Sequence, residues 1–64
     1  MSPYAACKLI NARLKVDGVD KVLPPQMFYT YKKKNYIDFT SEESVIGWYE
    51  KKYLPMLRLR LIEV

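Results

Sequence analysis

The stretch PPQMFYTYKKKNYI, residues 24–37, contains the features that decide the fold. Two prolines open it, and proline suits the first turn of a helix because its missing amide has no partner there. The large apolar side chains after the prolines follow an i, i+1, i+4 spacing, which puts them on one inward face: Met27, Phe28 and Tyr31. Asn35 can adopt the left-handed conformation that ends a helix. The stretch therefore predicts a helix over residues 24–34.

The same region carries the excess positive charge of the protein. Residues 21–37 contain four basic residues and no acidic one: Lys21, Lys32, Lys33 and Lys34. The other seven basic residues balance the seven acidic ones, so the whole net charge of +4 comes from this region. Such a patch favours an anionic partner, either nucleic acid or an acidic protein surface. The alternative is a solvated helix end whose lysines complement the helix dipole.

Upstream, the pattern predicts an amphipathic helix over residues 3–16. Ser2 is a suitable N-cap, Pro3 suits the first helical position, and Gly18 can take the left-handed conformation after the last turn. One apolar stripe is expected to face the core: Ala5, Leu9, Ala12 and Val16, with Ala6 and Ile10 beside it. Either Val22 or Leu23 is expected to pack inward from the connector after this helix.

Downstream, TSEE at residues 40–43 has the form of a capping box, with Thr40 as the N-cap and Glu43 as its partner. This signal predicts a third helix over residues 41–53. Its inward side chains are expected to be Val45, Trp48 and Tyr49, with Ile46 and Tyr53 alongside. Pro55 is expected to prevent the helix from continuing.

The tail MLRLRLIEV alternates leucine with arginine, which predicts a half-buried strand over residues 57–62, although a short terminal helix is an alternative. A strand needs a neighbour, either residues 36–39 of the same chain, as a minimal wing, or a second copy in a homodimer. The expected partner or dimer interface consists of Leu57, Arg58, Leu59, Arg60 and Leu61. The fold expected is a single, mainly α domain over residues 1–64 with three helices and this strand.

Composition limits the chemistry that is expected. The 64 residues include one cysteine and no histidine, so we expect no intrachain disulfide, metal site or cofactor. No nucleophile, base or glycine-rich loop stands at a catalytic spacing, so we expect no enzyme. Neither a signal peptide nor an apolar run long enough to cross a bilayer is evident, and we expect a cytoplasmic protein without membrane contact.

The segment FYTYKKKNYI and the capped helix EESVIGW after it resemble the MerR-like and excisionase-like (AlpA-type) helix-turn-helix domains, over about residues 16–49. In that family an apolar and an aromatic residue of the recognition helix pack inward, and Phe28 and Tyr31 occupy those places. Asn35 stands where the family has glycine, Tyr36 and Ile37 correspond to the pair that closes the turn, and almost no wing fits before Thr40.

The resemblance implies a DNA-binding protein of excisionase or transcription-regulator type, common in phages and mobile elements, with the helix over 24–34 in the major groove of double-stranded DNA. Its contact residues would be Gln26, Tyr29, Thr30, Lys32, Lys33 and Lys34. The amide of Gln26 would suit adenine, whereas the lysines would meet phosphates. The alternative function is a small inhibitor or adaptor that docks on a larger protein through the same face or the tail.

Overall fold

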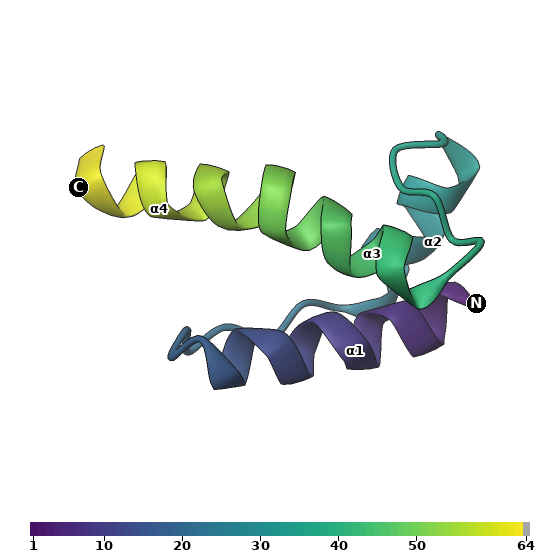
Figure 1. Ribbon diagram of the computed structural model, residues 1–64, viewed down its shortest axis with the longest axis horizontal. Helices are drawn as coiled ribbons and strands as arrows, with labels where there is room; N and C mark the ends of the chain where they lie inside the picture. Colours follow the sequence, from purple (N-terminus) through teal and green to yellow (C-terminus); the bar gives the residue numbers. More distant parts are fainter. Residues whose placement is uncertain (64) are drawn as a thin grey trace.

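The structure, a computed structural model, describes the backbone of residues 1–63 and the side chains of residues 1–59. Five helical elements succeed one another: α1 (Pro3–Val16), α2 (Pro25–Lys33), α3 (Glu42–Trp48), the π-helical turn η1 (Tyr49–Tyr53) and α4 (Leu54–Glu63). In Figure 1, α3, η1 and α4 form one continuous rod that runs in the same direction as α1, and α2 lies near the end where both begin. The expectation of a mainly α fold is confirmed. No helix of residues 1–63 has the length and hydropathy needed to cross a bilayer.

Helix α1 has the bounds that its terminal residues predict. The Ser2 side chain accepts a hydrogen bond from the Ala5 amide at 3.1 Å, and Pro3 occupies the first helical position. At the other end Gly18 has a φ of 76°, and the Val19 amide donates to the Leu14 carbonyl at 2.9 Å. This pair of features is a Schellman termination, which needs a residue that tolerates positive φ.

The face that α1 turns inward differs from the expected one. Its buried apolar side chains are Ala6, Cys7, Ile10 and Leu14, with Pro3 at the start. Of the expected stripe, Ala5 and Leu9 are half-buried, Ala12 is exposed, and Val16 is 79% exposed. The stripe was misplaced because two adjacent columns of α1 are apolar, and the sequence pattern alone does not say which of them packs against α2 and α3.

The connector is held against α1 by the side chain of Asn11. Its carboxamide oxygen accepts from the Leu23 amide at 2.8 Å, and its nitrogen donates to the Leu23 carbonyl at 3.1 Å. The thiol of Cys7, only 3% exposed, also donates to this carbonyl at 3.3 Å, and burial raises the pKa of the thiol. Leu23 is therefore buried, whereas its neighbour Val22 is 81% exposed.

Helix α3 begins one residue later than the capping box predicted. Ser41, not Thr40, is the N-cap, and its hydroxyl accepts from the Ser44 amide at 3.2 Å. The Thr40 amide donates instead to Oδ1 of Asp38 at 2.9 Å, which keeps Thr40 in the preceding turn. Residues 36–39 form no strand, although Ile37 and Phe39 from this segment are buried in the core.

The strand expected over residues 57–62 is wrong, because this segment belongs to α4. The helix also passes through Pro55, which was expected to stop it. In a regular α-helix the ring of Pro55 would collide with the carbonyl group of Lys51. The turn before it is π-helical, with the Leu54 amide donating to the Tyr49 carbonyl five residues back. We attribute the continuity of the rod to this wider turn, which displaces the carbonyl groups that face the proline.

Tyr49 joins η1 to the end of α1. Its side chain is fully buried, and its hydroxyl donates to Oδ2 of Asp17 at 2.6 Å. Burial, followed by the hydrogen bond and the charge of Asp17, raises the pKa of Tyr49 to about 12. Arg13 and Glu50 form an ion pair at 3.1 Å nearby, but about half of each side chain is exposed to solvent, so this pair contributes little stability.

Replacement of Asn11 tests the attachment of the connector. Asn11→Ala leaves the amide of the buried Leu23 without a side-chain acceptor and its carbonyl group with the Cys7 thiol alone, so we expect the free energy of unfolding to fall by about 2 kcal/mol. Urea denaturation followed by circular dichroism measures this loss. Gln26→Ala removes an exposed carboxamide and is the matched control, with a change below about 0.5 kcal/mol. Equal stability of the two variants would contradict the role of Asn11.

Replacement of Tyr49 tests its raised pKa. Below pH 10 the phenol is protonated in both states, and between pH 10 and 12 it ionises first in the unfolded chain, which favours unfolding. The stability that wild type has over Tyr49→Phe should therefore fall by about 2 kcal/mol across this range. Denaturant unfolding at several alkaline pH values measures it. Tyr29→Phe, at an exposed tyrosine, should match wild type, and parallel curves for all three proteins would refute the prediction.

Candidate nucleic-acid interface

All six residues expected to contact DNA lie on α2 or at its C-cap, and all are exposed: Gln26, Tyr29, Thr30, Lys32, Lys33 and Lys34. Tyr29 leaves 54% of its surface in contact with solvent. The Thr30 hydroxyl donates to the Gln26 carbonyl at 3.1 Å, which leaves its oxygen free to accept a further hydrogen bond. This outward face, which we call the α2 face, therefore combines an amide, two hydroxyl groups and three ammonium groups.

The opposite side of α2 fixes the helix in place. Phe28 is fully buried, and its ring meets the rings of Tyr31 and Trp48 edge to face, with both centroid distances at 6.3 Å. Met27 and Tyr31 are half-buried, so the inward face expected from the sequence is confirmed with Phe28 at its centre. Close packing around one buried ring holds the α2 face in a single orientation.

The two ends of α2 differ in how they can receive an anion. Pro24 is the N-cap and Pro25 comes next, so neither residue offers an amide hydrogen, and no side chain caps this end. At the other end Asn35 has a φ of 57°, and the Tyr36 amide donates to the Tyr31 carbonyl at 2.9 Å. The left-handed stop expected at Asn35 is confirmed. Phosphate groups would thus meet the lysines rather than helix amides.

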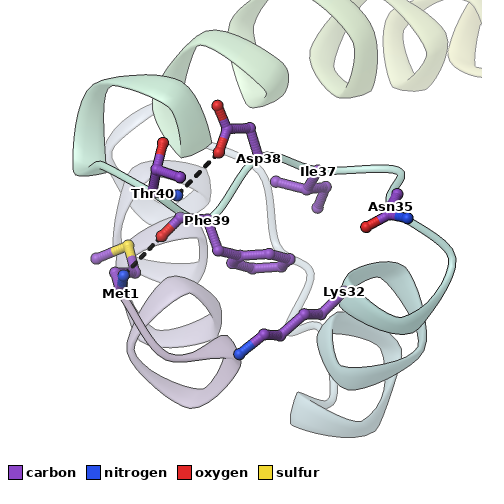
Figure 2. Close-up of a pocket in the computed structure, with 7 residues that line it drawn as sticks. All are labelled: Met1, Lys32, Asn35, Ile37, Asp38, Phe39 and Thr40. Carbon is purple, nitrogen blue, oxygen red and sulfur yellow. Dashed lines mark hydrogen bonds between the residues drawn. The ribbon is translucent and has the colours of Figure 1, made fainter.

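Two lysines at the C-terminal end of α2 lie in different surroundings. Lys34 lies with its ammonium 5.9 Å from the centroid of the Tyr36 ring. Lys32 extends across a hollow of about 510 Å³ between α2 and residues 37–40, as Figure 2 shows, and the Met1 ammonium donates to the Phe39 carbonyl beside this hollow at 2.6 Å. Positive charge therefore spreads over two sides of the C-terminal end of α2.

The acidic residue nearest in sequence to this end is Asp38. Figure 2 shows its carboxylate turned away from Lys32 and bonded to the Thr40 amide. Hydrogen bonds from Thr40 lower the pKa of Asp38, so it stays ionised in the turn that it stabilises. No ion pair joins the α2 lysines to an acidic side chain within residues 1–59, and their charge is available to a ligand.

The second set of expected interface residues lies on α4, apart from the α2 face. Leu57 is buried in the core, whereas Arg58 is exposed and Leu59 is 60% exposed. The side chains of Arg60 and Leu61 lie outside the described part of the structure. Because the segment is helical, it cannot supply the strand edge through which a dimer or partner was expected to pair.

The sequence did not indicate that part of the aromatic core is open to solvent. Trp48 and Tyr31 were expected to be core residues, but both are half-buried, and Tyr36 beside them is 58% exposed. A signal was available, since three large aromatic side chains on the same side of a small core exceed what 64 residues can enclose.

The chain was also compared with known proteins. No protein-family model matches it, and neither a curated protein nor a solved structure does so.

Proposed function

We propose that this chain is a small DNA-binding protein of excisionase or transcription-regulator type that presents α2 to the major groove of double-stranded DNA. The observation that carries the proposal is the α2 face: six exposed hydrogen-bonding and basic residues on one short helix, without an acidic partner among residues 1–59. The resemblance of residues 16–49 to helix-turn-helix domains supports the same assignment.

The dimensions of α2 suit a groove. An α-helix with its side chains is about 10–12 Å across and the major groove is about 12 Å wide, so a helix such as α2 can enter it. Gln26 and Thr30 are one turn apart near the N-terminal half, where they would face base edges. Lys33 and Lys34 would then lie at the far end, at the height of the phosphate backbone. Tyr29, between these groups, can donate a hydrogen bond to either.

The electrostatic contribution would be independent of DNA sequence. Each phosphate neutralised by a lysine releases condensed counterions, so the logarithm of affinity falls with the logarithm of salt concentration. Three lysines on a domain this small give modest non-specific affinity, and a specific complex would need further copies or partners along the DNA. Docking on an acidic protein surface through the same face is the alternative, and it predicts no dependence on DNA sequence.

The first test replaces the three lysines of α2 together with alanine, as Lys32→Ala, Lys33→Ala and Lys34→Ala. We expect weaker binding to every duplex and a salt slope reduced by about 2 to 3, because each lost phosphate contact removes about 0.9 from it. Fluorescence anisotropy with mixed-sequence duplexes at several salt concentrations measures both. The control removes the same charge elsewhere, at Lys8, Lys15 and Lys51, which are also exposed. Identical affinities for the two triple variants would refute contact by α2.

The second test separates base contacts from phosphate contacts. Gln26→Ala should relax sequence preference, because the carboxamide that pairs with adenine is lost, at a cost of about 1–3 kcal/mol for the preferred base. Selection from a randomised duplex pool, followed by competition against non-specific DNA, measures this preference. Asn11 is unsuitable as a control because it holds the connector; Glu50→Ala, on η1, should leave the selected sequence unchanged. An unaltered site for Gln26→Ala would show that this residue does not select the base.

A further inference from the structure

A second hollow lies where α2, the loop after it, the end of α3, η1 and the start of α4 meet. Its cavity volume is about 270 Å³, and four of its six lining residues are aromatic: Tyr31, Tyr36, Trp48, Lys52, Tyr53 and Met56. We call it the aromatic pocket. None of the six α2 face residues lines it, so a ligand of this pocket would be independent of the proposed DNA contacts.

The π-helical turn brings the lining residues of the rod to one side. A π-helix closes its hydrogen bonds over five residues, which places residues five apart in sequence above one another. The rings of Trp48 and Tyr53 accordingly lie 5.4 Å apart with an angle of 32° between their planes. In a regular α-helix, residues five apart would diverge by about 140° around the axis. The turn that accommodates Pro55 thus also assembles this wall of the pocket.

The other walls meet at steep angles. The ring of Tyr31 is 5.7 Å from that of Tyr36 at 60°, and 5.8 Å from that of Trp48 at 61°. Rings in this arrangement form a concave surface. Because these rings are steeply inclined to one another, a flat nucleobase could stack on only one of them at a time.

The polar groups at the pocket favour a ligand with negative charge. Among residues 1–59, the hydroxyl groups of Tyr31 and Tyr36 and the indole N–H of Trp48 make no hydrogen bond to another protein group, and all three can donate. Lys52 lines the pocket and is exposed, and the Lys34 ammonium lies 5.9 Å from the Tyr36 ring. Within residues 1–59, no acidic side chain lines the pocket.

These features argue against two of the three common ligands of aromatic pockets. A methylated ammonium group is attracted by ring faces, but here it would meet Lys52 with no carboxylate among the described lining residues to offset the repulsion. Pockets for drug-sized molecules or cofactors usually measure about 300–1,000 Å³, and this pocket lies at the lower end of that range. One large side chain fits the size, and the surrounding lysines fit acidic neighbours on the same peptide.

We propose that the aromatic pocket binds a partner protein through an acidic peptide segment, which places one phenylalanine or tryptophan side chain in the hollow lined by Tyr31 and Trp48 and pairs a carboxylate with Lys52. A second copy of this chain does not offer such an acidic segment with an exposed aromatic side chain. Its exposed aromatic residues outside the pocket are Tyr4 and Tyr29, and neither has an acidic residue within two positions in sequence.

Trp48 is the only tryptophan of the chain, so its fluorescence reports directly on the pocket. The probe is an eight-residue peptide with one phenylalanine between glutamates, titrated to about 1 mM while Trp48 emission is recorded. Two matched peptides replace the phenylalanine with alanine or the glutamates with lysines. We expect saturable binding of the first peptide and at least about tenfold weaker binding of the other two.

Variants on exposed residues keep the test independent of folding. Lys52→Glu and Tyr36→Ala should each weaken the peptide by about tenfold, whereas Lys51→Glu, which makes the same charge change outside the pocket, should bind nearly as wild type does. Circular dichroism of each variant checks that it is folded. The double variant Lys32→Ala, Lys33→Ala distinguishes this site from the α2 face, since it removes two DNA contacts and leaves both the pocket lining and Lys34 intact.

Four results would overturn the proposal: no saturable change in Trp48 emission at about 1 mM peptide, equal binding of the alanine peptide, no effect of Lys52→Glu, or tighter binding of a trimethyllysine peptide. A single-stranded oligothymidine that displaces the acidic peptide at lower concentration would assign the pocket to nucleotides instead. Loss of the emission change on dilution of the protein, with peptide held constant, would assign it to self-association.

Discussion

The placement of α2 depends on one side chain of α1. The carboxamide of Asn11 pairs with both backbone groups of Leu23, much as a neighbouring strand would, and so satisfies a stretch of connector that belongs to no helix or sheet. Leu23 then fills the core, and the two prolines after it direct the chain straight into α2. Everything that the α2 face can present to a ligand depends on this fixed entry point. In a chain of 64 residues without a disulfide, such a local attachment replaces a covalent one.

The sequence predicts those features that depend on near neighbours. Ser2, Gly18 and Asn35 each act through hydrogen bonds within a few residues, and the bounds of α1 and the end of α2 are set by them. Long-range packing is not encoded in this way. The inward face of α1 packs against α2 and α3, and its Asn11 binds Leu23 twelve residues away; no periodicity records these contacts. Of the candidate site, the exposure of the α2 face could be predicted. The number of large aromatic side chains indicated that some would stay exposed to solvent, but it did not indicate which ones.

The strand expected over residues 57–62 was wrong for a different reason. Alternation of leucine and arginine has period two, yet Leu54 and Leu57 also lie one turn apart on a helix, and both are packed against the core. The separate expectation that Pro55 ends the third helix was also wrong, because the rule that proline ends a helix assumes a regular α-helix before it. The π-helical turn removes that assumption. Local strain relief of this kind leaves no pattern in the residues on either side.

The π-helical turn makes the aromatic pocket depend on the number of residues in the chain. It amounts to one residue more than an α-helix needs between Trp48 and Leu54, and one residue rotates the next part of the helix by about 100°. A chain shorter by one residue here could keep α1, α2 and α3 unchanged while turning Met56 and its neighbours to another side. The aromatic pocket is thus a property of chain length as much as of composition, and a single codon gained or lost in this segment would be enough to create or abolish it.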